Sequence, residues 1–117
     1  MLKRLILLLL LLVLPAIAAT PTYYYVVTAV DTGGVESGFS NQATAAFPAG
    51  HNTASLSWTA PTVTGSQKPI AGYNVYRGTA TGGPYTMVNT ALVTGVTYSD
   101  TPFVPPSAPS NLVATVP

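Results

Sequence analysis

The sequence contains few side chains that can do chemistry. Its acids are Asp31, Glu36 and Asp100, its one histidine is His51, and it has no cysteine. Asp31 opens the triplet Asp31-Thr32-Gly33 directly after an apolar run. If two copies of a chain brought two such triplets together, two carboxylates would share one proton and could activate water for peptide hydrolysis.

The residues around Asp31 favour a turn instead. Aspartate and glycine in "VDTGG" suit a hairpin turn between two strands, because aspartate bonds nearby main-chain groups and glycine accepts positive φ. No later strand ends in the apolar-glycine pattern that braces a protease site of this kind. We therefore expect no catalytic residue, and a dimeric aspartic protease that uses Asp31 remains as the enzyme alternative.

The other candidates for chemistry are weaker. His51 lies in a short polar linker without a nucleophile motif, so we expect a solvated loop histidine. Asp31 and Glu36 flank one turn, but calcium requires several closely spaced acids. No glycine loop joins a strand to a helix, and the formal net charge is only +1. We predict no metal, no cofactor and no nucleic-acid partner.

The first residues have the composition of a secretory signal peptide. Lys3 and Arg4 precede an apolar run from Leu5 to Leu14, and small residues lead to a cleavage site after Ala18. We predict a signal peptide at residues 1–18 and one domain at 19–117. The protein would be secreted, extracellular or in the cell envelope. It would have no stable membrane anchor after cleavage, because the apolar run is too short to span.

The rest of the chain is expected to be all-β. Residues Tyr23 to Val30 alternate so that Tyr23, Tyr25 and Val27 share one face. A return strand is expected at about 40–47 and a last short strand at about 111–116. Strands around Trp58, Tyr73 and Val75 would supply the rest of the core, with Trp58 at its centre.

The opposite face carries the possible recognition surface. Alternation points Tyr24 and Tyr76 away from the core, and we expect them to form an exposed aromatic pair with Arg77 flanking it. Such a pair can stack on a carbohydrate or a protein surface, and it can also simply stabilise the sheet.

These segments together resemble the fibronectin type III domain over nearly the whole chain after the leader. "ASLSWTAP" is similar to the family's strand B, with Trp58 as its core tryptophan, and "IAGYNVYRGT" is similar to strand C, with Tyr73 as its core tyrosine. "GGPYTMV" and "TYSDT" resemble strands C′ and E, "TYYYVVTAVDTGGVESGFSNQATA" resembles F and G, and "PSAPSNLVAT" resembles A. The resemblance implies an immunoglobulin-like β-sandwich of the type found in tandem in secreted bacterial proteins. There it acts as a spacer, adhesion or binding module.

The order of the segments departs from that family. It runs F-G-B-C-C′-E-A here, as if cut out of register from a tandem array. Three outcomes remain open. The chain completes its own sandwich when A returns to the edge beside B, or it self-associates by exchanging strands with a neighbouring subunit, or it is a gene fragment without a stable native state.

Overall fold

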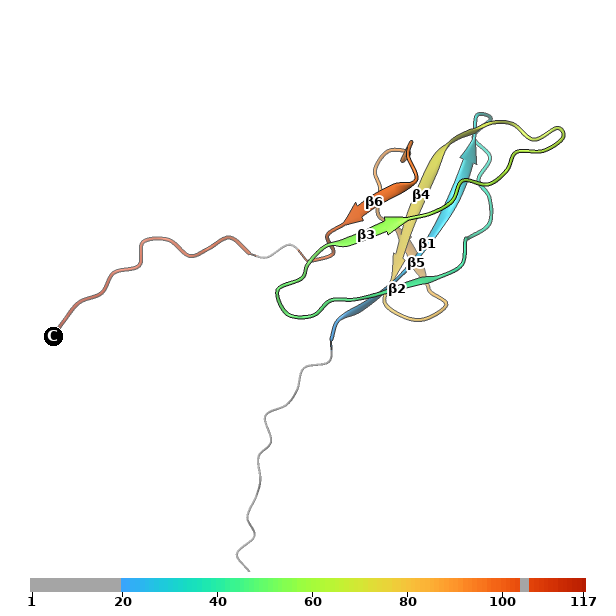
Figure 1. The fold of residues 1–117 in the computed structure, drawn as a ribbon. Helices are drawn as coiled ribbons and strands as arrows, with labels where there is room; N and C mark the ends of the chain where they lie inside the picture. The colour runs from blue at the N-terminus through green and yellow to red at the C-terminus, as the bar shows by residue number, and fades with distance from the viewer. Residues whose placement is uncertain (1–19, 104–105) are drawn as a thin grey trace, which may run out of the picture.

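The computed structural model describes residues 20–103 and 106–117, so the predicted signal peptide lies outside the described residues. Within them the chain is all-β and contains no helix (Figure 1). The strands are β1 (Thr22–Asp31), β2 (Ala43–Ala46), β3 (Ala54–Ser57), β4 (Ile70–Gly78), β5 (Tyr85–Met87) and β6 (Thr97–Asp100).

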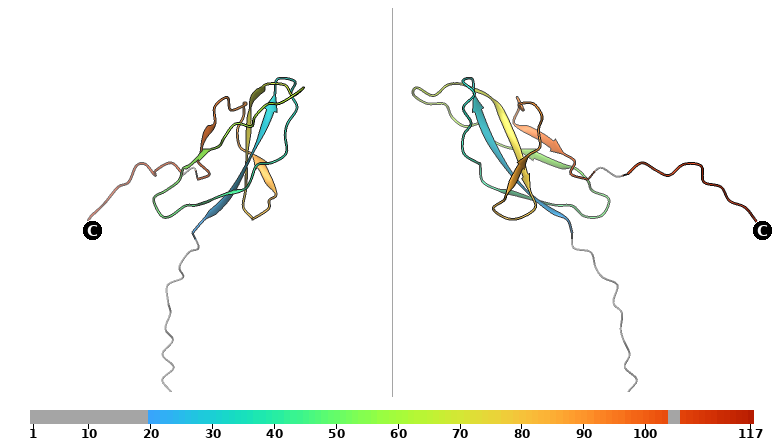
Figure 2. Two further views of the ribbon diagram at one scale, coloured as in Figure 1. Left: turned by 45° about the vertical axis from the view of Figure 1, so that its right-hand side comes forward. Right: turned by 180° about the vertical axis from the view of Figure 1, so that it is seen from behind.

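The strands form two antiparallel sheets. The larger sheet has the order β2-β1-β4-β5, and the smaller sheet pairs β3 with β6. Figure 2 shows the smaller sheet as a layer separate from β1 and β4, which is consistent with a β-sandwich. Strand β1 pairs with β4, so that Ala29 lies opposite Tyr73 and Val27 opposite Val75.

The core lies between the two sheets. Tyr25 and Val75 are at its centre, with 1% and 0% of their surface exposed, and Phe47 and Ala54 complete the buried cluster. Tyr23 and Val27 pack against this cluster from the same face of β1 as Tyr25. The alternation that predicted an inward face for these residues of β1 is therefore confirmed.

Trp58 belongs to this core but is not its centre. It follows β3 directly, is only half-buried, and packs edge-to-face on Tyr73 with ring centroids 5.3 Å apart. Its Nε1 is buried and has no hydrogen-bond acceptor among the described residues. The indole also lines a groove beside β3.

The return strand is shorter than the predicted range 40–47. Serine side chains explain the difference, because Ser37 and Ser40 follow the edge of β1 without regular pairing. The N–H groups of Ser37 and Ser40 donate to the carbonyls of Ala29 and Val27, both at 2.8 Å. The Ser37 and Ser40 hydroxyls accept the N–H groups of Ala29 and Val27 in return. Hydroxyl oxygens thus replace main-chain carbonyls, and regular strand begins only at Ala43.

The prediction of a strand at 111–116 is wrong for this structure. Residues 106–117 contain no strand and are exposed throughout, and Figure 1 shows the segment leading away from the body. Asn111 has φ 59°, which interrupts extended backbone. A strand forms only where another strand supplies its hydrogen bonds, and this segment has none in its own body. The chain therefore does not complete its own sandwich in the way the first of the three outcomes requires.

Candidate functional site

Asp31 holds the turn that follows β1. Its Oδ1 accepts the N–H of Gly33 at 2.8 Å and the N–H of Val35 at 3.0 Å. Gly34 has φ 81°, a left-handed conformation that glycine adopts without steric cost. The carboxylate of the Asp-Thr-Gly triplet thus satisfies main-chain donors of its own turn, as the turn interpretation of the sequence predicts.

His51 is exposed in the connection between β2 and β3. No hydrogen bond joins its side chain to another described residue, and only its main chain is engaged, donating to Pro48 at 3.0 Å. Across residues 20–103 and 106–117, no cluster of three histidine, cysteine, aspartate or glutamate side chains is arranged to hold a metal ion.

Tyr24 and Tyr76 both lie on the face of the larger sheet that points away from β3 and β6, which we call the outer face. The two residues are diagonal neighbours and are not directly opposed. Tyr24 lies opposite Gly78, whereas Tyr76 lies opposite Val26. The ring of Tyr85 covers Gly78, where a Cβ would come within 3.0 Å of it. Tyr85 lies opposite Gly78 from the other side, so Gly78 separates Tyr24 from Tyr85.

Phe39 was missed in the sequence, yet it is the most exposed aromatic ring of the outer face. It stands between Tyr76 and Tyr85 in edge-to-face contact, with centroids 5.2 and 5.4 Å away. The side chain is 56% exposed. A phenylalanine within the polar, serine- and glycine-rich stretch "ESGFSN" was the signal that could have identified it. We call Phe39, Tyr76 and Tyr85 the aromatic cluster.

The connection between β1 and β2 is held across the outer face by its own polar side chains. Glu36 Oε1 accepts hydrogen bonds from the Thr28 hydroxyl, the Tyr76 hydroxyl and Asn74 Nδ2. These bonds, that of Thr28 first, hold the pKa of the Glu36 carboxyl below its ordinary value. The bond to Glu36 raises the pKa of Tyr76. The hydroxyl of Tyr76 is therefore committed to the fold and only partly available to a ligand.

Gln42, at the end of the same connection, also forms hydrogen bonds across the outer face. Its Oε1 accepts the Tyr85 hydroxyl at 2.5 Å and the Gly82 N–H at 2.8 Å. Glu36, Phe39 and Gln42 thus connect one edge of the larger sheet to β4 and β5. The outer face is not the open tyrosine surface that the sequence suggested, and the exposed part of the aromatic cluster is mainly Phe39.

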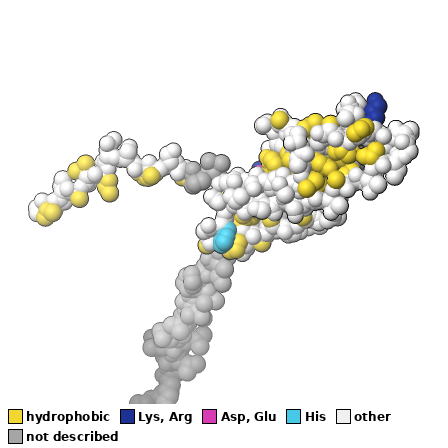
Figure 3. All heavy atoms as spheres, turned by 45° about the horizontal axis from the view of Figure 1, so that its top comes forward, with side chains coloured by type: hydrophobic (Ala, Val, Ile, Leu, Met, Phe, Trp, Pro, Cys, Tyr) yellow, Lys and Arg dark blue, Asp and Glu magenta, His cyan; other side chains and the backbone are white. Residues whose placement is uncertain are grey.

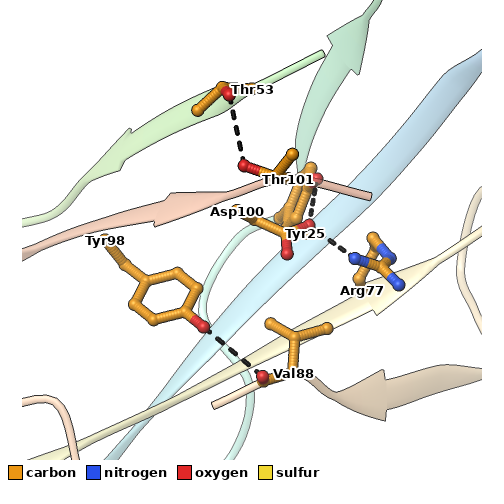
Figure 4. A network of polar contacts seen from close by, with 7 residues as sticks. All are labelled: Tyr25, Thr53, Arg77, Val88, Tyr98, Asp100 and Thr101. Atoms are coloured by element: carbon orange, nitrogen blue, oxygen red, sulfur yellow. Dashed lines mark hydrogen bonds and ion pairs between the residues drawn. The ribbon is translucent and has the colours of Figure 1, made fainter. Parts of the chain in front are cut away.

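Arg77 does not flank this face, and that prediction is wrong. Successive residues of a strand point to opposite faces, so Arg77 must point away from the side of Tyr76. Its Nη1 forms an ion pair with Asp100 Oδ2 at 2.7 Å, and its guanidinium lies 5.3 Å from the ring centroid of Tyr23. Figure 4 shows Arg77 and Tyr25 converging on Asp100 between the sheets.

Asp100 is thus the centre of a buried polar bridge. The Tyr25 hydroxyl donates to the same Oδ2 at 2.7 Å. Burial, and then the bond to Asp100, raise the pKa of Tyr25 well above its ordinary value, so the hydroxyl keeps its proton. The bridge joins β1 and β4 of the larger sheet to β6 of the smaller one and serves the fold.

The fold and these contacts define an all-β protein of two antiparallel sheets. No family model, no curated protein and no solved structure matches the chain. None of the described residues forms a helix long and apolar enough to cross a membrane.

Proposed function

We propose that the chain is a secreted, non-catalytic structural or binding module of the fibronectin type III kind. The observation that carries this proposal is how the three carboxylates are used. Asp31 bonds its own turn, Glu36 fastens the β1–β2 connection, and Asp100 joins the two sheets. The acids of the sequence thus stabilise the fold, and none of these bonds holds a carboxylate for general acid or base chemistry.

The strand arrangement supports the family part of the proposal. In the order that the resemblance implies, β2-β1-β4-β5 corresponds to G-F-C-C′ and β3-β6 corresponds to B-E. The core tryptophan and core tyrosine of that resemblance, Trp58 and Tyr73, pack on each other. Secretion is supported by the composition of residues 1–18, and a secreted module would lie outside the cell or in its envelope.

The aromatic cluster is the surface we propose for recognition of a carbohydrate or a protein. Phe39 offers an exposed ring held upright by two tyrosines, and rings so fixed can contact a flat apolar surface at little entropic cost. Loops on a rigid sheet commonly carry binding residues, and Phe39 lies on such a loop. The alternative of a plain spacer needs no such surface.

Activity measurements test the non-catalytic part. The enzyme alternative requires pepstatin-sensitive peptide cleavage at acid pH that disappears in Asp31→Asn. Asparagine keeps the Oδ1 acceptor of the turn, so this variant removes the charge without removing the bonds to Gly33 and Val35. We expect wild type and Asp31→Asn to show the same background rate, and cleavage confined to the wild type would overturn the proposal.

Binding measurements separate a recognition module from a spacer. The chain is sedimented with cellulose, chitin and peptidoglycan, and Phe39→Ala is compared with Val96→Ala. Both variants remove an apolar side chain that is at least 39% exposed, but only Phe39 belongs to the aromatic cluster. Retention lost in Phe39→Ala alone supports recognition, whereas equal behaviour of the two variants removes this surface and leaves the spacer role.

A further inference from the structure

One edge of the smaller sheet has no partner in the described part of the chain. There β3 pairs with β6 alone, through the opposed residues Ala54 and Asp100, Leu56 and Tyr98, and the Trp58 N–H that donates to Val96 at 3.0 Å. Main-chain groups alternate in direction along an antiparallel strand, so those of Ser55 and Ser57 point to the other edge. No hydrogen bond from the described residues reaches them there.

A groove opens behind this edge, because two strands face four. It is a cavity of about 370 Å³ between β3 and the β1–β2 side of the larger sheet. Tyr25, Val27, Leu56 and Trp58 form its apolar part, and Ser40, Asn41, Ser57 and Thr59 form its polar part. Leu56 and Trp58 point inward from β3 and its end, yet both are only half-buried. The sandwich therefore lacks a strand at the position where Ser55 and Ser57 present free main-chain groups.

The same chain carries an apolar segment without a partner. Leu112 and Val116 are each 96% exposed, and Val113 is 77% exposed. Leu112, Ala114 and Val116 alternate with Val113 and Thr115, the pattern of a strand with one apolar face. Figure 3 shows hydrophobic side chains along this segment, away from those of the body. Its five residues match in length the edge from Ala54 to Trp58.

We propose that Leu112–Val116 of one copy adds as a strand to the β3 edge of a second copy, with Leu112, Ala114 and Val116 entering the groove. This rests on the proposed function, since it names the partner of the module as another copy of this chain. Strand addition supplies the hydrogen bonds that Ser55 and Ser57 lack and covers Leu56 and Trp58. The donor and the acceptor are different surfaces, so the contact repeats from copy to copy.

The position of the segment favours a second copy over the chain's own edge. The chain leaves β6 at Asp100, opposite Ala54 at the start of β3, whereas an antiparallel strand added to β3 begins beside Trp58 at the other end. Residues 101–111 include Pro102, Pro105, Pro106 and Pro109, and a stretch of that length reaches about 34 Å when extended, which is enough for either edge. Residues 106–117 are exposed throughout and lead away from the body (Figure 1), so the segment is presented to a neighbouring molecule.

Two variants separate the donor from the acceptor. Leu112→Asp puts a charge where the groove is apolar, and it cannot unfold the body because Leu112 contacts nothing there. Ser57→Pro removes an N–H at the free edge and leaves the hydrogen bonds between β3 and β6 intact. Val113→Asp is the matched control, since Val113 points to the opposite face of the added strand.

The experiment is sedimentation velocity on the full chain over a range of concentrations. We expect the mass of the wild type and of Val113→Asp to rise with concentration, and Leu112→Asp and Ser57→Pro to stay monomeric when alone. An equimolar mixture of these two should give heterodimers and nothing larger, because it contains one intact donor and one intact acceptor.

Three results would overturn the proposed strand addition between copies. The first is a wild type that stays monomeric while the amide hydrogens of Ser55 and Ser57 exchange with solvent faster in Leu112→Asp, because the segment then pairs with its own body. The second is a monomeric wild type in which Leu112→Asp leaves the hydrogen exchange of these amides unchanged, because the groove then has another occupant or none. The third is association that survives Leu112→Asp. Cooperative melting of the monomeric variants would leave the proposed module intact in each case, whereas non-cooperative melting would count against the module itself.

Discussion

The hydroxyl of Tyr25 donates a hydrogen bond to Asp100 Oδ2 at 2.7 Å and joins residues that are 75 positions apart in the chain. Arg77 donates to the same oxygen at 2.7 Å. Tyr25 and Asp100 are buried, so the carboxylate depends on these donors where water does not reach it. This shared acceptor holds β1, β4 and β6 at fixed positions and couples the two sheets.

Replacing Tyr25 by phenylalanine removes only one hydroxyl, yet it should lower the stability of the fold considerably. The bond to a buried carboxylate is lost, and the free energy of unfolding should fall by about 1.5–3 kcal/mol. Tyr98→Phe is the control, because the Tyr98 hydroxyl donates only to the uncharged Val88 carbonyl at 3.3 Å, and about 1 kcal/mol is expected there. Urea denaturation at neutral pH measures both, and equal losses would show that the bond to Asp100 contributes no more than a bond to an uncharged carbonyl.

The pH dependence of stability should reveal Glu36. Its pKa lies below the ordinary value of 4.5, chiefly because Thr28 and then Tyr76 donate to the carboxylate. A depressed pKa contributes stability that is fully present above the unfolded value of 4.5 and is lost as the pH falls through the lower folded value. The melting temperature of the wild type should therefore fall more steeply on acidification than that of Glu36→Gln.

Glu36→Gln is itself the control for the remaining acids, because Asp31 and Asp100 titrate in both proteins. The difference between the two melting curves should be largest well above pH 4.5 and should shrink below it. A difference that stays constant across this range would mean that the charge of Glu36 contributes nothing to the bonds with Thr28 and Tyr76.

The core could be predicted from local pattern alone. In β1 the alternation of apolar residues places Tyr25 and Val27 on one face, and any sheet that buries that face buries them. The same rule, applied to Tyr76, would have shown that Arg77 points to the opposite face. The error over Arg77 therefore lay in the interpretation, and the sequence contained the information.

The outer face and the last segment could not be predicted in this way. The contacts of Glu36 and Phe39 with β4 and β5 depend on how an irregular connection folds back, and no local period encodes that path. Leu112–Val116 has the composition of a strand, but strand formation depends on a distant edge with free main-chain groups. Pattern shows which residues can form strands, whereas pairing is decided by the three-dimensional arrangement.

Two glycines of the β1–β2 connection should respond in opposite ways to alanine. Neither Gly34 nor Gly38 has an atom within 4 Å of the position that a Cβ would occupy, so space is equal at both. Gly34 has φ 81°, and alanine there should cost about 1–2 kcal/mol. Gly38 has no left-handed conformation, so Gly38→Ala should be neutral or slightly stabilising by restricting the unfolded chain. Thermal melts measure both, and equal losses would contradict the turn geometry at Asp31.

The size of the Trp58 side chain should matter for the stability of the fold, whereas its N–H group should not. Trp58→Ala removes the ring that packs on Tyr73 and widens the groove beside β3, and because the indole is only half-buried the loss should be about 3 kcal/mol, at the lower end for such changes. That is a large part of the stability of a small domain, so Trp58→Ala should melt at a much lower temperature than the wild type. Trp58→Phe keeps a ring against Tyr73 and deletes an Nε1 that has no acceptor in the described part of the chain. The stability lost in Trp58→Phe should be less than half that lost in Trp58→Ala, because no hydrogen bond is broken.

Denaturation followed by far-ultraviolet circular dichroism measures both variants without relying on tryptophan fluorescence. A cooperative melt of Trp58→Ala at the temperature of the wild type would show that the indole does not support the packing of the two sheets.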